Sequence, residues 1–195
     1  MIKLKLKYKG SRKYLHGSDI FNALSNNFSE IFPDSFVSNL IFKRFARNQL
    51  CILFDKFADE NNLMGYGNIK LGNGKTKKFW IKETDNEVKS SYEFKEELIE
   101  SQTIINRNQI SVSNIDIFTL IENIIILTKK INYLLCPLIE GNWIFSQLKL
   151  ETKFPKNWDK IDIILEDIKN KSYSQNKIII DNKNYGIIKF MVAKV

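Results

Sequence analysis

The only histidine of the chain, His16, lies in a short polar segment just before an expected helix. The segment reads Tyr14-Leu15-His16-Gly17-Ser18-Asp19. An imidazole is the usual general acid or base near neutral pH. Backbone amides at a helix start can also polarise a carbonyl oxygen or hold a developing oxyanion. The segment therefore predicts acid–base chemistry on a carbonyl compound, with local capping or packing as the alternative role for His16.

A carboxylate that could act with His16 lies on a second, more apolar helix. Segments 19–26 and 116–123 match at one constant offset, which aligns Asp19 with Asp116. The same offset aligns His16 with Ser113, and it aligns Ser25 of the first helix with Glu122 of the second. We predict a single composite catalytic site from His16 and Glu122. The alternative for Glu122 is an ordinary solvated position.

The neighbours of His16 are the predicted substrate-binding residues. Arg12 could meet a phosphate or carboxylate, because its guanidinium donates in a fork. Ser18 is the expected N-cap of the first helix, and Asp19 suits the positive end of the helix dipole. The predicted substrate-binding set is Arg12, Tyr14, Gly17, Ser18 and Asp19.

Other kinds of site lack their sequence signatures. The chain has no GxGxxG, Walker, CxxC, HxxxH or GxSxG motif, so no metal or cofactor is expected. Cys51 and Cys136 are expected in the core rather than in a disulfide framework. The net charge of +8 comes mainly from dispersed lysines. Because these lysines are dispersed, a nucleic-acid-binding function is disfavoured. It is not ruled out, and it would use the lysine-rich segments 2–9 and 75–82.

No targeting or membrane segment is expected. The N-terminal MIKLKLKYKG alternates lysine with apolar residues, unlike a secretory signal. Segment 115–135 is the most apolar, but it carries several charged residues and predicts a buried helix instead of a membrane span. We expect a cytoplasmic protein without membrane insertion.

The periodicity of the apolar residues predicts two similar halves. Period-two alternation over 2–9 predicts a strand with solvated lysines. Helical spacing over 18–32 and the apolar segment 115–135 predict one main helix in each half. The strands are expected at 38–47, 49–57, 62–71, 77–84, 143–154, 160–171 and 176–193, the last with a turn at 181–184.

Further matches favour an internal duplication with repeats 1–86 and 87–195 packed as one globular unit. Ile41-Phe42 matches Ile144-Phe145, and the segment 78–81 matches 189–192. Order is preserved, and each match falls on the same type of element.

An apolar helix followed by long antiparallel strands resembles the hotdog fold, and the tandem arrangement resembles double-hotdog proteins. The implied class is α+β, with a central helix wrapped by a sheet in each half. An unrelated α+β topology, such as a split β-α-β pair, stays open. The resemblance implies action on acyl thioesters of coenzyme A or acyl carrier protein, as a dehydratase or thioesterase.

Hotdog dehydratases have a histidine ahead of the central helix and a carboxylate on the partner helix, and His16 and Glu122 resemble this pair. Their longer proline-bearing loop is absent here. A non-catalytic member that binds an acyl chain or a protein is the first alternative, and nucleic-acid binding is the second. A homodimer is left open.

Overall fold

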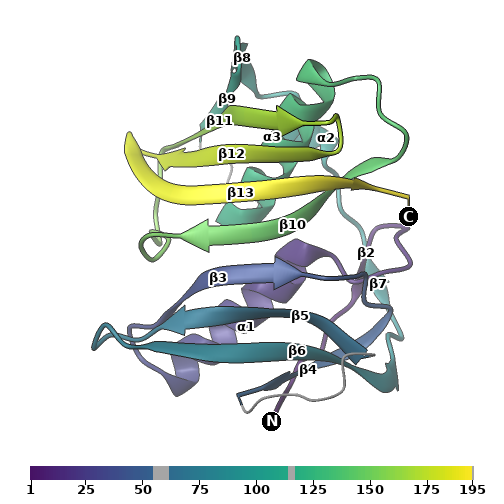
Figure 1. Cartoon of the computed structure of the whole chain (residues 1–195), viewed down its shortest axis with the longest axis vertical. Helices are drawn as coiled ribbons and strands as arrows, with labels where there is room; N and C mark the ends of the chain where they lie inside the picture. Colours follow the sequence, from purple (N-terminus) through teal and green to yellow (C-terminus); the bar gives the residue numbers. More distant parts are fainter. Residues whose placement is uncertain (55–61, 114–116, 195) are drawn as a thin grey trace. The chain divides into compact units, whose positions relative to one another are not determined.

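The computed structural model describes residues 1–54, 62–113 and 117–194. The chain divides into two units, Met1–Phe94 and Lys95–Val195. Each unit has one main helix on one face of an antiparallel sheet (Figure 1). The expected repeat boundaries at 86 and 87 stay a prediction.

The first unit contains one long helix and a five-stranded sheet. The helix α1 spans Gly17–Ile31. The sheet has the order β1-β4-β6-β5-β3, and a separate parallel pair joins β2 to β7. The strands are β1 (Ile2–Lys3), β2 (Tyr8–Lys9), β3 (Phe36–Phe42), β4 (Asn48–Leu53), β5 (Leu63–Lys70), β6 (Thr76–Glu87) and β7 (Ser91–Tyr92).

Helix α1 buries one apolar face against this sheet. Leu24 and Phe28 are fully buried, and the Phe28 ring meets the Phe79 ring edge-on at 5.0 Å. Gly67 on β5 makes room for Phe79 on β6, because a Cβ at Gly67 would lie 2.6 Å from the phenylalanine ring. Close packing of this kind leaves no space for an added methyl group.

The N-terminal segment differs from its prediction. Only its ends pair as strands, Ile2–Lys3 and Tyr8–Lys9. Leu4 and Leu6 are buried as the alternation predicts, but Lys9 is fully buried instead of solvated. The second of these strands pairs in parallel with β7, which period-two alternation does not reveal. Gly10, with a φ of 61°, follows it.

The second unit contains a short helix, a long helix and six strands in the order β10-β13-β12-β11-β9-β8. The helices are α2 (Glu97–Glu100) and α3 (Leu120–Leu135). The strands are β8 (Ile104–Asn106), β9 (Gln109–Ser113), β10 (Asn142–Leu150), β11 (Lys160–Lys169), β12 (Tyr173–Ile180) and β13 (Lys183–Ala193). The predicted turn at 181–184 joins β12 to β13.

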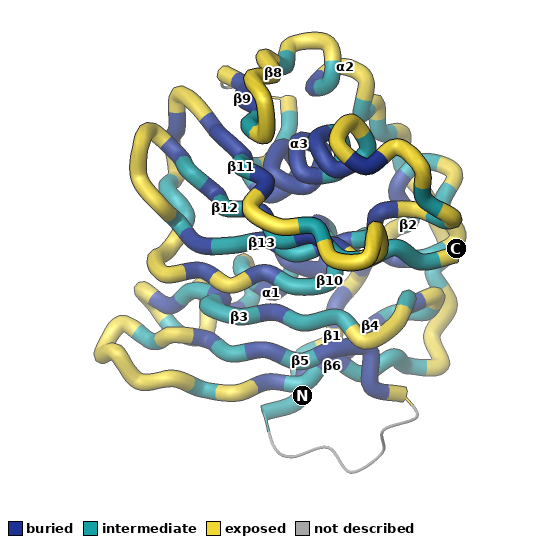
Figure 2. Tube along the Cα trace, turned by 45° about the horizontal axis from the view of Figure 1, so that its top comes forward, coloured by how far each residue is buried: buried dark blue, intermediate teal, exposed yellow. Residues whose placement is uncertain are grey.

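Helix α3 is buried along most of its length, as its composition predicts (Figure 2). It packs against β9, β10, β11 and β12. Its buried polar residues are partly satisfied within the unit: Thr128 donates to the Ile124 carbonyl, and the Asn132 amide donates to Ser174 Oγ at 2.7 Å. The predicted buried helix is confirmed over the described residues.

The first strand after the long helix has the same sheet position in both units, but the order of the later strands differs. In both, the strand that follows the long helix lies at one end of the unit's sheet, and Ile41-Phe42 and Ile144-Phe145 fall on these strands. The last strand of the first unit, β6, lies between β4 and β5. The last strand of the second, β13, lies between β10 and β12. The match of 78–81 with 189–192 therefore joins strands in different sheet positions.

Candidate functional site

Helix α1 begins immediately after His16, which is its N-cap residue. His16 has extended backbone angles, and its carbonyl accepts from the Asp19 and Ile20 amides at 3.1 and 3.2 Å. The prediction that Ser18 is the N-cap is therefore wrong. Ser18 lies in the first turn with its side chain fully buried, because its hydroxyl is drawn into a polar cluster.

The Ser18 hydroxyl is the centre of this cluster. Its Oγ atom lies 2.8 Å from His16 Nδ1, 2.7 Å from Lys9 Nζ and 3.1 Å from Asp19 Oδ1. The Ser18 amide also donates to His16 Nδ1 at 3.4 Å, a long hydrogen bond by which the His16 side chain caps the helix. The hydroxyl therefore makes the main contact that orients the imidazole through Nδ1.

Lys9 brings a buried positive charge to the cluster. Its side chain is 0% exposed, and its Nζ atom lies 3.0 Å from Asp19 Oδ1. The same atom lies 4.0 Å from the centre of the Phe94 ring, a cation–π distance. A buried ammonium is tolerated only with such partners, because loss of its hydration is costly.

Asp19 receives hydrogen bonds from three side chains. The Tyr92 hydroxyl lies 2.9 Å from both carboxylate oxygens, in addition to the contacts from Lys9 and Ser18. Tyr92 reaches this position because β7 pairs with β2 in parallel, with Lys9 opposite Tyr92. The Asp19 carboxylate therefore does more than interact with the helix dipole.

Glu122 forms a capping box at the start of α3. Its carboxylate accepts from the Thr119 amide at 2.9 Å and from the Thr119 hydroxyl at 2.8 Å. The expectation of an ordinary solvated helix position is wrong for Glu122, which is 9% exposed. Ser113, the counterpart of His16, is exposed at the end of β9. Asp116 lies outside the described residues.

The remaining predicted substrate-binding residues lie on the segment before α1 and at the first residue of the helix. The Tyr14 ring packs against Phe45 at a centroid distance of 4.9 Å. Arg12 donates to the Lys9 carbonyl at 3.3 Å. Gly17 is the first residue of the helix, where the amides have no carbonyl partner within the helix. The structure thus brings His16, Ser18 and Asp19 into one cluster.

Sequence reasoning missed Lys9, Tyr92 and Phe94 as members of the cluster. Lys9 continues an alternating lysine pattern, so its type and spacing predict a solvated side chain. Tyr92 and Phe94 lie between the expected strand at 77–84 and the expected helix at 115–135. Nothing local in the sequence indicates that they meet the start of α1.

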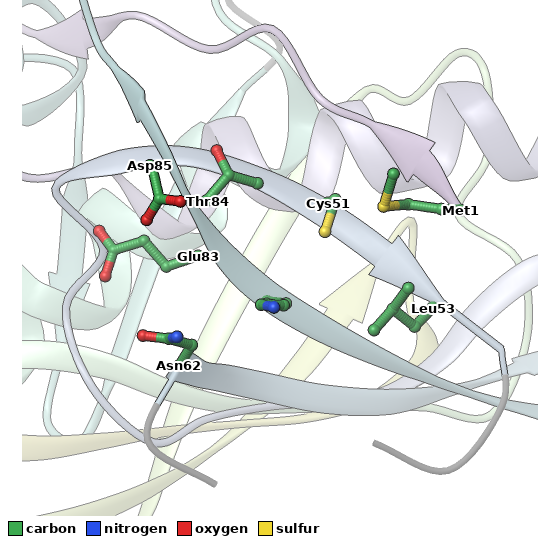
Figure 3. A pocket seen from close by; sticks show the side chains of 8 residues that line it. Met1, Cys51, Leu53, Asn62, Glu83, Thr84 and Asp85 are labelled. Carbon is green, nitrogen blue, oxygen red and sulfur yellow. The ribbon is translucent and has the colours of Figure 1, made fainter. Parts of the chain in front are cut away.

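A pocket of about 230 Å³ lies elsewhere on the first unit (Figure 3). It contains none of the predicted site residues. Burial raises the pKa of its Cys51 thiol, so the reactive thiolate is disfavoured at neutral pH. Glu83 accepts from the Arg47 and Asn48 amides at 2.5 and 2.6 Å. The lining residues are Met1, Cys51, Leu53, Asn62, Lys82, Glu83, Thr84 and Asp85.

The lysines of the predicted nucleic-acid segments have varied surroundings. Lys9 is buried, as described above. Lys77 lies over the Phe54 ring at 4.7 Å, and Lys78 lies over the Trp80 ring at 5.0 Å. Several of these lysine ammonium groups therefore lie over aromatic rings of the same chain.

The described residues contain no cluster of three or more histidine, cysteine or acidic residues arranged to hold a metal ion. None of their helices combines the length and apolar character needed to cross a membrane.

Comparison with known proteins finds similarity in structure alone. No protein-family model matches the chain, and no curated protein matches its sequence. The structure is similar to the dehydratase domain of PpsC from Mycobacterium tuberculosis, solved with an acyl-CoA. The TM-score is 0.50 at 6% identity, covering 92% of this chain and 85% of the other. The fold is of the hotdog type.

Two further hotdog-like structures are similar over nearly the whole chain. One is a monomeric dehydratase domain from a trans-AT polyketide synthase split module, with a TM-score of 0.47 at 8% identity and coverage of 98% and 96%. The other is an acyl-ACP thioesterase from Bacteroides thetaiotaomicron, with a TM-score of 0.44 at 8% identity and coverage of 97% and 95%. The predicted resemblance to hotdog dehydratases is confirmed at the level of the fold by the PpsC dehydratase domain.

Proposed function

We propose that this chain is an acyl-thioester enzyme of the hotdog type, acting as a dehydratase or thioesterase on acyl-CoA or acyl carrier protein. The observation that carries the proposal is the orientation of the only histidine: Ser18 holds His16 Nδ1 at the start of the long helix of its unit. The hotdog fold supports the substrate class by analogy, since folds of one type host many activities.

The chemistry assigned to His16 is proton transfer at its second ring nitrogen, Nε2. In a dehydratase, the imidazole would take a proton from C2 of a 3-hydroxyacyl thioester. The bond from C3 to its hydroxyl would then break, and the leaving hydroxyl would take that proton from the imidazolium and depart as water. In a thioesterase, it would take a proton from the water that attacks the thioester carbonyl. The Gly17 amide at the helix start would polarise that carbonyl.

Glu122 is proposed as the carboxylate partner of this chemistry, in one composite site formed by the two repeats. The sequence alignment of the two helices supports this, with Ser113 and Ser25 at the positions that would complete a second site. The capping box gives Glu122 a structural role as well. The proposal also includes tandem repeats, Arg12 and Tyr14 as substrate contacts, and a cytoplasmic location.

The His16→Asn variant tests the assignment most sharply. Asparagine is a good N-cap residue, so this variant keeps the helix start while it removes the acid–base group. We expect turnover to fall at least about 100-fold with an unchanged urea midpoint. Lys13→Ala, an exposed position in the same segment, is the matched control and should keep full activity.

The assays must cover both reactions and both carriers. Dehydration is followed by enoyl-thioester formation from 3-hydroxyacyl-CoA and 3-hydroxyacyl-ACP, and hydrolysis by thiol release from the saturated esters. Unchanged turnover in His16→Asn would remove His16 as the catalytic group. No turnover by the wild type, together with a retained acyl ligand in mass spectrometry, would support the non-catalytic binding module instead.

Glu122→Gln separates the two roles of Glu122. Glutamine keeps the oxygen that accepts from Thr119, but it cannot exchange a proton as a carboxylate does. We expect Glu122→Gln to lose turnover at wild-type stability. Full activity would leave Glu122 with its capping role alone.

A further inference from the structure

Three polar side chains meet inside the second unit, between α3 and β12. Asn132 lies on α3, whereas Ser174 and Asn176 lie on β12. All three residues are 0% exposed. The Asn132 amide donates to Ser174 Oγ at 2.7 Å, and the Asn176 amide donates to the same atom at 3.1 Å. Both amides therefore converge on one hydroxyl group.

The strand next to this polar cluster presents apolar side chains. On β13, Phe190 pairs with Ser174 and Ile188 pairs with Asn176, and both apolar residues are buried. An amide oxygen without a hydrogen bond is strongly disfavoured in such surroundings, because it has given up its hydration for nothing. Each polar atom of the cluster therefore needs a partner.

Two oxygens of the cluster, Asn132 Oδ1 and Asn176 Oδ1, have no hydrogen-bond partner within the described part of the chain. Each oxygen shares its carbon atom with the nitrogen that donates to Ser174, so both oxygens lie close to the Ser174 hydroxyl. Ser174 Oγ accepts from both nitrogens. These bonds use its two lone pairs and leave its hydrogen to donate. The cluster thus offers two acceptors and one donor to a further group.

A water molecule matches this set of donors and acceptors. It has two hydrogens, one for each amide oxygen, and it can accept the hydrogen of Ser174. Buried waters typically make about three hydrogen bonds to polar groups that have no other partner. Reversal of either amide would present a nitrogen in place of an oxygen, and a water can accept from that nitrogen as well. The match therefore holds for both orientations of each asparagine.

Other groups match the cluster less well. An ammonium ion only donates, so the Ser174 hydrogen would face it without an acceptor. A calcium ion takes about six to eight oxygen ligands, whereas the cluster offers two amide oxygens and one hydroxyl. An acyl chain would leave both amide oxygens without a hydrogen bond. Water is the ligand that satisfies every atom of the cluster.

We propose that Asn132, Ser174 and Asn176 form a binding site for one ordered water, which joins α3 to β12. The water completes the hydrogen bonds of this helix–sheet contact and fixes the position of the last turns of α3 on the sheet. Asn132 follows Glu122 by ten residues, about 15 Å along the helix axis, so the site is separate from the capping box. The water site does not depend on the proposed acyl-thioester activity.

A crystal structure of the wild-type chain tests the site without any variant. We expect electron density for one water within about 3.2 Å of both amide oxygens and of Ser174 Oγ. Density for a larger group at this position would overturn water as the ligand. Amide orientations that pair Asn132 and Asn176 fully with protein atoms, with no water between them, would overturn the site itself.

Oxygen-17 relaxation dispersion tests the site in solution, because it counts the long-lived waters of a protein. Asn132→Leu removes the amide at similar volume, and we expect one long-lived water fewer than in the wild type. Asn106→Leu, at an exposed position of the same unit, is the matched control and should keep the wild-type count. If Asn132→Leu does not fold, Asn176→Leu makes the same comparison. An unchanged count in the folded variant would contradict the water site.

Discussion

The Nζ atom of Lys9 lies 2.7 Å from Ser18 Oγ and 3.0 Å from Asp19 Oδ1, with the lysine side chain fully buried. Lys9 lies in the two-residue strand β2, whereas Ser18 lies in the first turn of α1. The contact therefore ties the N-terminal segment to the helix that carries His16. The Lys9–Asp19 pair also keeps the charges of the cluster balanced.

Replacement of Lys9 by methionine should destabilise the protein strongly. Lys9→Met keeps an apolar stem but leaves Asp19, with 12% side-chain exposure, without its cation. Removal of one partner from a buried pair typically costs about 3 to 5 kcal/mol in the free energy of unfolding, and we expect about 3. Urea unfolding measures the loss. Lys7→Met, at an exposed position, should change it by about 0.5 kcal/mol or less.

A stability of Lys9→Met equal to that of Lys7→Met would contradict the buried pair. It would show that Lys9 is hydrated in solution. The comparison is matched because both substitutions remove one lysine charge from the same alternating segment.

The Tyr92 hydroxyl should contribute to stability through Asp19. Tyr92→Phe removes the hydroxyl that lies 2.9 Å from both carboxylate oxygens and keeps the ring. Because the acceptor is charged, we expect a loss of about 1 to 2 kcal/mol in the free energy of unfolding. Tyr8→Phe removes an exposed hydroxyl that donates to the Arg47 carbonyl and should cost about 0.5 kcal/mol. Equal losses in the two variants would count against a special role for Tyr92.

The capping box predicts how Glu122 affects stability. Glu122→Ala removes the acceptor for the Thr119 amide and hydroxyl, and we expect a loss of about 1 kcal/mol. Glu122→Gln keeps an oxygen at that position and should lose much less. Thermal and urea unfolding of both variants make the comparison. A similar loss in both would mean that the charge of Glu122, rather than its oxygen, stabilises the unit.

The sequence predicted the elements of the fold more fully than their arrangement. The apolar spacing over 18–32 and the composition of 115–135 identify α1 and α3, because burial of a helix face determines both patterns. The order of the strands in each sheet cannot be predicted in this way. Nothing in the residues of β6 and β13 indicates that one lies between β4 and β5 and the other between β10 and β12.

The candidate site was predicted in part for the same reason. His16, Ser18 and Asp19 are neighbours in sequence, so a helix start brings them together. Tyr92 and Lys9 meet them through the parallel pairing of β2 with β7, which is a long-range contact without a local signal. The alternating pattern also predicted a solvated side chain for Lys9, since charged residues are seldom fully buried unless they are paired.

Asp162 in the second unit should make stability depend on pH. Burial alone would raise the pKa of its carboxyl group, but hydrogen bonds from Lys160, Ser111 and Gln109 outweigh burial and lower it. The Lys160 ammonium lies 2.9 Å away, and the Gln109 amide also donates at 2.9 Å. A folded pKa below the unfolded value of about 3.9 gives stability that is present above that pH and lost as the pH falls through the folded pKa.

Asp162→Asn should therefore cost about 2 kcal/mol in the free energy of unfolding at pH 7, with the difference from wild type shrinking below about pH 4. Urea unfolding over a pH series measures both values. Asp167→Asn, with 46% side-chain exposure and a 3.6 Å contact to Lys169, should differ from wild type by about 0.5 kcal/mol or less throughout. A deficit in Asp162→Asn that stays constant down to pH 3 would mean that the ionised carboxylate contributes nothing, and that the cost comes from packing of the asparagine amide.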